Sequence, residues 1–237
     1  MWRYLPWLVF CATTIVRADV CQGLPLAPSV GSTFELGTRA VSFRLPVKSG
    51  GPEFRITIRP IPIVRPPNDD AFVHSGDIEV ERCQDGKQLQ VLPLMAWQPV
   101  NFAPTFHAQD VNFDGYLDFA VLAEYAGKWG SESWWVYDSA AGRFVQNELT
   151  QDLRKLKANG VRIDPKKQEI STSYLTEPWG CGSTGNRYRV VNNRLVIVHE
   201  EVPKPFENGC TVTVSDLAGG TMHVTAVLRF EGGTRVQ

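Results

Sequence analysis

IEVERCQDGKQLQVLP, residues 78–93, alternates apolar and polar side chains on both sides of Gln84-Asp85-Gly86. Alternation with a period of two is typical of a strand with one buried face, and a short connection ending in Asp-Gly favours a hairpin. The stretch therefore predicts two antiparallel strands joined by a tight turn. The same pattern returns along the chain, and for this reason it decides the fold class.

Four further pairs of alternating segments are separated by turn-forming residues. These turns are Ser139–Gly142, Pro165-Lys166, Asn192-Asn193 and Asp216–Gly220. We expect an all-β protein of twisted antiparallel sheets built from successive hairpins, arranged as a sandwich or an incomplete propeller. One short helix interrupts the series, because leucines recur at helical spacing in residues 148–160. Thr150 is its expected N-cap and Gly160 its expected stop.

The first eighteen residues have the layout of a cleaved secretory signal. A basic Arg3 precedes an apolar stretch, and Val16 and Ala18 precede the expected cut. Removing residues 1–18 leaves 237 − 18 = 219 residues, with 22 basic and 25 acidic side chains and a net charge of −3. This charge balance gives no indication of a nucleic-acid partner. We expect a periplasmic protein without a transmembrane segment, and a lipoprotein is the weaker alternative.

The cysteine count agrees with export. Of five cysteines, one lies in the predicted signal, and Cys21, Cys83, Cys181 and Cys210 remain. Four cysteines in an oxidising compartment suggest two disulfides with three connectivities, among which we favour the neighbours in chain order, Cys21–Cys83 and Cys181–Cys210. A zinc site is the competing interpretation, but no CxxC or histidine pairing supports it.

Proline divides the chain into two portions. Residues 59–70 carry four prolines and cannot form an interior strand. We therefore expect an N-terminal β portion over residues 19–70, ending in a Pro-rich connection. The main β domain then covers residues 71–237.

DVNFDGYLDFAVL, residues 110–122, concentrates oxygen-bearing side chains immediately before an apolar strand. An EF-hand would need Glu at position 12, where Val121 stands, and a following helix. The first nine positions nevertheless match a short calcium loop of the kind found in integrin-α blades. The expected ligands are Asp110, Asn112, Asp114, the carbonyl of Tyr116, and Asp118. A metal-free turn rich in Asp and Asn is the alternative, and the expected role of the metal is structural.

WGCGSTGNRYRV, residues 179–190, comes close to two enzyme motifs and satisfies neither. A nucleophile elbow needs Gly at Cys181, and a papain-like motif needs Cys at Thr184. The stretch predicts instead an exposed loop of small residues leading to Tyr188 and a strand. Thr184 to Tyr188 resembles the Ser-Gly-x-x-Tyr signature of bacterial periplasmic lysozyme inhibitors, with Thr in place of Ser.

The wider resemblance covers about residues 100–200. DVNFDGYLDFAVL, GKWGSESWWVYDSAAGRF, LTQDLRKLKANGVRID and GCGSTGNRYRVVNNRLVIV together resemble calcium-binding periplasmic immunity proteins against type IV secretion effectors that cleave peptidoglycan. These are similar in turn to inhibitors of invertebrate-type lysozyme.

The resemblance implies a function in interbacterial competition. The protein would be an inhibitor without catalytic activity of its own, binding a lysozyme-like hydrolase whose cleft holds two carboxyl groups. The implied inhibitory loop comprises Ser183, Thr184, Gly185, Arg187 and Tyr188.

A second interpretation is a calcium-stabilised carbohydrate-binding or adhesion module of integrin-like β type. It rests on exposed tryptophans among Trp129, Trp134, Trp135 and Trp179. Trp134 and Trp135 are adjacent on an expected strand, so they must point to opposite faces. An enzymatic function ranks third among the interpretations, because the sequence shows no nucleophile, no acid/base pair and no open metal site.

Overall fold

The structure is a computed structural model of the chain. It describes residues 19–29, 34–35, 39–61, 71–99, 105–125, 130–156, 161–175 and 183–236. The predicted signal, residues 1–18, lies outside the described residues, as do residues 62–70 of the Pro-rich connection. The only helix in the described part of the chain is short, and no described helix is long and apolar enough to cross a membrane.

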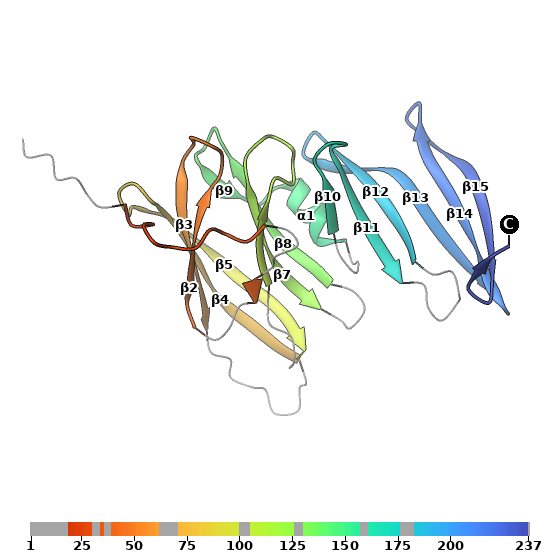
Figure 1. Cartoon of the computed structure of the whole chain (residues 1–237), viewed down its shortest axis with the longest axis horizontal. Helices are drawn as coiled ribbons and strands as arrows, with labels where there is room; N and C mark the ends of the chain where they lie inside the picture. Colours follow the sequence, from red (N-terminus) through yellow and green to blue (C-terminus); the bar gives the residue numbers. More distant parts are fainter. Residues whose placement is uncertain are drawn as a thin grey trace, which may run out of the picture.

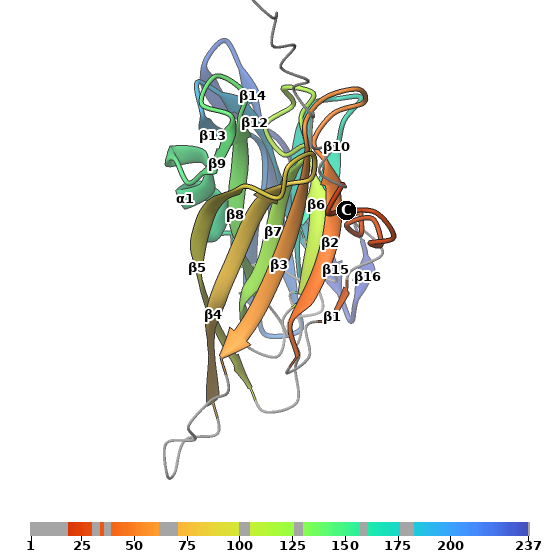
Figure 2. The same cartoon turned by 90° about the vertical axis from the view of Figure 1, so that its left-hand side faces the viewer.

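The first half of the chain forms a curled nine-stranded sheet (Figures 1 and 2). Its strands are β1 (Phe34–Glu35), β2 (Val41–Pro46), β3 (Glu53–Ile61), β4 (Ala71–Arg82), β5 (Gln88–Pro99), β6 (Thr105–Gln109), β7 (Asp118–Tyr125), β8 (Gly130–Asp138) and β9 (Arg143–Val145). The main path runs β1-β6-β7-β5-β4-β3-β2, and β8 joins β7 to β9. One pairing in this sheet is parallel, between Trp97 of β5 and Glu124 of β7.

The second half forms a seven-stranded antiparallel sheet in simple chain order. Its strands are β10 (Val161–Asp164), β11 (Glu169–Leu175), β12 (Ser183–Val191), β13 (Arg194–Phe206), β14 (Gly209–Ala218), β15 (Thr221–Glu231) and β16 (Thr234–Arg235). Figure 1 shows β10 and β11 beside the first sheet and β14 and β15 at the far end of the molecule. The predicted all-β class of twisted antiparallel sheets is therefore confirmed.

The hairpin predictions hold because turn chemistry is local. The Asp85-Gly86 turn joins β4 to β5, and Asn192 and Asn193 join β12 to β13 with φ of 50° and 57°. Both asparagines occupy the left-handed region, which their short polar side chains tolerate. The other three predicted turns join β8 to β9, β10 to β11 and β14 to β15. The last is shorter than predicted, because residues 216–218 belong to β14 and only Gly219 and Gly220 form the turn.

The short helix α1 (Glu148–Arg154) is present, but the predicted N-cap is wrong. Asn147 is the N-cap, and its side chain accepts a hydrogen bond from the Thr150 backbone N–H at 3.1 Å. Thr150 is the third helical residue, and its hydroxyl accepts a hydrogen bond from the Asn147 backbone N–H at 2.8 Å. This reciprocal pair is a capping box. The helix ends at Arg154, before Gly160, which lies outside the described residues.

The Pro-rich stretch does not separate two sheets. Its first three residues, 59–61, belong to β3, which pairs with β4 from Phe54 opposite Arg82 to Ile61 opposite Ser75. β2 pairs with β3 only as far as Ile58, so among the described residues 59–61 have a strand on one side only, a position that proline tolerates. Both flanks therefore belong to the first sheet. The change of sheet comes later in the chain, after β9 and α1.

Two main cores stabilise this arrangement. One lies inside the curl of the first sheet and includes Phe54, Phe119 and Trp135. The other lies between the first sheet, α1 and the start of the second sheet, and includes Trp134, Leu149 and Ile170. Because each face of β8 meets one core, both adjacent tryptophans are buried, Trp134 being 1% exposed and Trp135 4%.

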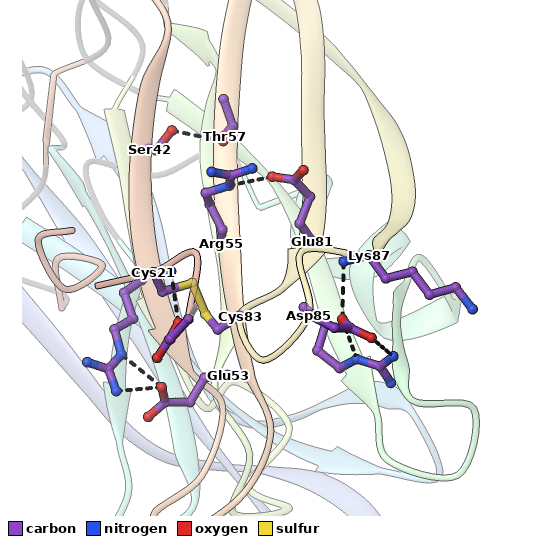
Figure 3. Close-up of a disulfide and its surroundings, with 12 residues drawn as sticks. Cys21, Ser42, Glu53, Arg55, Thr57, Glu81, Cys83, Asp85 and Lys87 are labelled. Atoms are coloured by element: carbon purple, nitrogen blue, oxygen red, sulfur yellow. Dashed lines mark hydrogen bonds and ion pairs between the residues drawn. A yellow bond between two sulfur atoms is a disulfide. The ribbon is translucent and has the colours of Figure 1, made fainter. Parts of the chain in front are cut away.

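The predicted Cys21–Cys83 disulfide is present and ties the N-terminal segment to the end of β4 (Figure 3). Val20 supports the link by donating its N–H to the Cys83 carbonyl at 3.0 Å. Cys210 is buried and disulfide-bonded. Its predicted partner, Cys181, lies outside the described residues, so the Cys181–Cys210 pairing stays a prediction.

Candidate functional site

The acidic stretch forms a tight loop between β6 and β7. The Asp110 carboxylate closes it by accepting the N–H groups of Asp114 at 3.2 Å and Gly115 at 2.9 Å. Gly115 has a φ of 83° and Phe113 a φ of 62°, so the backbone turns through the left-handed region twice. The loop is therefore pinned to its first carboxylate from within.

Asn112 and Asp114 lie beside each other on the exposed side of this loop. The Asn112 amide nitrogen donates to the Asp114 carboxylate at 2.9 Å. The other Asp114 oxygen accepts the N–H of Tyr116, also at 2.9 Å. Together with Asp110, these residues place a side-chain amide and two carboxylates in one short loop.

Asp118 closes the loop from a buried position at the start of β7. Its two oxygens accept the N–H groups of Val111 at 2.9 Å and Tyr137 at 2.7 Å. Burial raises the pKa of Asp118 to about 8, although the backbone hydrogen bonds oppose this shift. Burial also raises the pKa of Asp110. A negative charge is therefore costly at both ends of the loop without a compensating cation.

The donor set of the loop fits calcium chemically. Carboxylate, amide and carbonyl oxygens are the ligands that Ca²⁺ prefers, and each of these carboxylate oxygens has lone pairs beyond the hydrogen bonds described above. The carboxylates of Asp110, Asp114 and Asp118 do not gather within 4.8 Å of one another. In the described part of the chain, one trio meets that distance, Asp19 with the disulfide-bonded Cys21 and Cys83.

The exposed loop predicted for residues 179–188 is wrong for residues 183–188, because these belong to β12, and residues 179–182 lie outside the described residues. Residues 183–188 pair with β11 from Leu175 opposite Ser183 to Ile170 opposite Tyr188. Thr184 is only 4% exposed, and Tyr188 is half-buried against the core between the sheets. Their hydroxyl groups are therefore not presented outward on a projecting segment.

Gly185 allows this close pairing. A Cβ atom at this position would lie 2.3 Å from the Thr172 carbonyl oxygen of β11, so any side chain would push the strands apart. The sequence pattern identified a small residue here but assigned it to a loop. The close approach of the neighbouring strand explains the glycine equally well, and that approach is visible only in the folded sheet.

Side chains continue the contact between β12 and β13 beyond the regular ladder. Glu201 accepts the Gly185 N–H at 2.8 Å, while its own N–H donates to the Asn186 side-chain oxygen at 3.3 Å. The Asn186 amide nitrogen donates to the Tyr188 hydroxyl at 3.2 Å. Glu201 and Asn186 thus hold the start of β12 in place.

A charged network covers the same face of the second sheet as Glu201. Buried Glu169 contacts Arg187 at 3.4 Å and Arg189 at 2.9 Å. Arg187 also lies 3.6 Å from Asp216, which binds His199 Nδ1 at 2.7 Å. The hydrogen bond from His199 is the main cause that lowers the pKa of Asp216.

The two arginines are the accessible cations of this network. The side chains of Arg187 and Arg189 are 42% and 59% exposed, although Glu169 beneath them is nearly covered. Sequence reasoning included Arg187 among the site residues but missed the others, which are Glu169, Arg189, His199, Glu201 and Asp216. No local motif marks these residues, because four strands, β11 to β14, bring them together.

The tryptophans of the adhesion interpretation do not form an exposed platform in the described part of the chain. Trp134 and Trp135 are both buried. Trp129 and Trp179 lie outside the described residues. Nothing in the described residues favours stacking of sugar rings on these side chains.

Comparison with known proteins identifies a shared fold. No protein-family model matches the sequence, and no curated protein matches it by sequence. The solved structure of a Xanthomonas type IV secretion system related protein matches with a TM-score of 0.56 at 15% identity. The match covers 82% of this chain and 98% of that chain. At this identity the likeness shows the fold alone.

Proposed function

We propose that this protein is an exported immunity protein that inhibits a lysozyme-like peptidoglycan hydrolase in the periplasm. The observation that carries the proposal is the fold match over 98% of a type IV secretion system related protein. It agrees with the resemblance of residues 100–200 to immunity proteins against type IV secretion effectors. The disulfide agrees with an oxidising compartment.

The proposed contact surface is the arginine face of β12. A lysozyme-like cleft presents two carboxyl groups beside the scissile bond, and guanidinium groups bind carboxylates with two parallel hydrogen bonds. Arg187 and Arg189 are exposed enough to exchange part of their contact with Glu169 for such a partner. In this proposal Thr184 and Tyr188 support the strand and do not enter the cleft.

The proposed role of the acidic loop is to hold a structural Ca²⁺ through Asp110, Asn112, Asp114, the Tyr116 carbonyl and Asp118. A dication supplies the positive charge that lowers the cost of burying Asp118 and Asp110. Asp118 also accepts the Tyr137 N–H of β8, so the metal would stiffen the attachment of the loop to β8.

Inhibition tests the contact surface. The mature protein is titrated against an invertebrate-type lysozyme and a lysozyme-like type IV secretion effector. The double variant Arg187→Ala, Arg189→Ala should weaken inhibition by about tenfold or more, because interface arginines often dominate binding. Arg59→Ala is the matched control, since its side chain is 55% exposed and also paired with a carboxylate.

The outcomes separate the function from the surface. If the wild-type protein inhibits neither enzyme, the proposed function is wrong. If the double variant inhibits as well as the control, the surface is wrong. Tyr188→Phe should retain inhibition; a loss of inhibition at an unchanged melting temperature would favour insertion of the hydroxyl group.

Thermal unfolding tests the metal. Adding Ca²⁺ to chelator-treated protein should raise the melting temperature, because a ligand bound only by the folded state stabilises it. Asp114→Asn should reduce this rise. Asp138→Asn is the matched control, since Asp138 also accepts backbone hydrogen bonds in an exposed turn, at 2.9 and 3.0 Å, outside the acidic loop. An equal rise in both variants would refute the assigned ligands.

A further inference from the structure

Residues 221–228 of β15 form a long outer edge at one end of the second sheet, next to the two-residue strand β16, whereas three strands at the other ends of the described sheets are short. β1, β9 and β10 are only two, three and four residues long. The edge of β2 is covered by a preceding segment, where Arg44 exchanges backbone hydrogen bonds with Pro25 at 2.8 Å and Ala27 at 2.9 Å. β15 has eleven residues, and β16 pairs only with its last two. An edge of this length is normally protected.

The free part of β15 lacks the usual protection. Residues 221–228, TMHVTAVL, contain no Lys, Arg, Asp, Glu or Pro. None of the eleven residues of β15 is buried. Leu228 and Phe230 pack against the small core of Cys210 and Val212, and residues 221–227 are held mainly by their ladder with β14. Figure 1 places this hairpin at the end of the molecule away from the first sheet.

A bulge gathers the exposed valines on one face. Val224 lies opposite Ser215 and Val227 opposite Thr213, because the register shifts by one residue between them. Ser215 and Thr213 are two residues apart and share a face, so the two valines share it as well. Val202 of β13 pairs with Thr213 from the opposite edge of β14, so it lies on the same face and extends the patch formed by Val224 and Val227. The three valines are 64%, 55% and 48% exposed.

We propose that the protein pairs with a second copy of itself through antiparallel β15 edges at Thr221–Leu228. A two-fold axis brings the same strand of both copies together in a contact that closes at the dimer. The backbone N–H and C=O groups of each edge then bond to those of the other copy. The absence of charge from residues 221–228 favours this occupant, because two identical edges place no like charges opposite each other. The valine patches of the two copies then form one continuous apolar face.

Sedimentation of the mature chain over a range of concentrations tests this pairing. The expected result is a reversible monomer–dimer equilibrium. The double variant Val224→Lys, Val227→Lys should raise the dissociation constant by about tenfold or more, because lysines then face each other across the axis. Val91→Lys is the matched control, since Val91 is 50% exposed on β5 of the first sheet.

Amide hydrogen exchange provides a second measurement on the unmodified chain. Protection at residues 221–228 should increase with protein concentration and remain unchanged elsewhere. A wild-type protein that stays monomeric, concentration-independent exchange in this strand, or a dimer that persists in the double lysine variant would overturn the proposal. Open-ended filaments would also overturn it, because a two-fold contact closes at the dimer.

Discussion

The carboxylate of Asp118 accepts the backbone N–H of Tyr137 at 2.7 Å and so fastens the acidic loop to β8. Its second oxygen accepts the N–H of Val111 at 2.9 Å. Both donors are backbone groups, and the carboxylate is fully buried between them. This side chain therefore has a structural task that does not depend on a metal.

Asp118→Ala should lower the free energy of unfolding by about 2–4 kcal/mol in the presence of chelator, because two buried N–H groups lose their acceptor. Urea denaturation with a chelator present measures this. Asp138→Ala, in an exposed turn, should cost less than about 1 kcal/mol. Equal losses in the two variants would contradict the structural role of Asp118.

Glu132 should make stability depend on pH. Burial raises its pKa from the ordinary 4.5 to about 7, and one of its oxygens lies 3.7 Å from His107 Nε2. The folded state therefore binds this proton more tightly than the unfolded chain. The resulting stabilisation is fully present below about pH 4.5 and is lost as the pH rises through about 7.

Glu132→Gln tests this dependence, because the amide does not titrate. We expect the free energy of unfolding of the wild-type protein, minus that of the variant, to decrease as the pH is raised from 5 to 8. Burial lowers the pKa of His107 to about 4, and His107 is present in both proteins. Comparing the two proteins therefore isolates Glu132. A difference that stays constant over this range would show that Glu132 ionises at its ordinary pKa.

Gly185→Ala should destabilise the protein by about 2 kcal/mol or more, because its Cβ atom would meet the Thr172 carbonyl oxygen at 2.3 Å. Backbone atoms of a paired strand cannot move aside as a flexible side chain can. Ser183→Ala, two residues earlier and exposed, should change stability by less than about 0.5 kcal/mol. If Gly185→Ala left the free energy of unfolding unchanged, β11 and β12 would have to separate easily at this point.

Replacing Cys21 and Cys83 by serine should lower the free energy of unfolding by about 3–4 kcal/mol, because the disulfide closes a long loop of the unfolded chain. The two cysteines are 62 residues apart in sequence. Denaturant titration of the double variant and the oxidised wild-type protein measures the loss. An unchanged midpoint would mean that the N-terminal segment contributes little to the folding of the first sheet.

Local chemistry explains why the hairpins could be predicted. Asn192 and Asn193 need only their own backbone to take up positive φ, and Asp85-Gly86 likewise specifies a turn between its two flanking strands. The Asn147 cap was missed although it is also local, because Thr150 also has a side chain that can cap a helix. Choosing between them depends on where the chain enters the helix.

The candidate site was predicted less well, for a different reason. Small and polar residues at Ser183–Tyr188 are as compatible with a loop as with a strand, since sequence alone does not show the Thr172 carbonyl above Gly185. Arg187 and Glu169 come from different strands, and their contact depends on the register between β11 and β12. A shift of one residue would send Arg187 to the other face.

The sequence by itself determined the alternation of strands and turns, the short helix, and the clustering of oxygen-bearing side chains between Asp110 and Asp118, because these features depend on neighbours in the chain. Only the tertiary structure decided that Trp134 and Trp135 would both be buried, that Thr184 would face inward, and that residues 221–228 of β15 would pair with a strand on one side only within the described part of the chain. Burial and strand order arise from contacts between distant segments, and residues far apart in sequence do not reveal such contacts until the sheets are assembled.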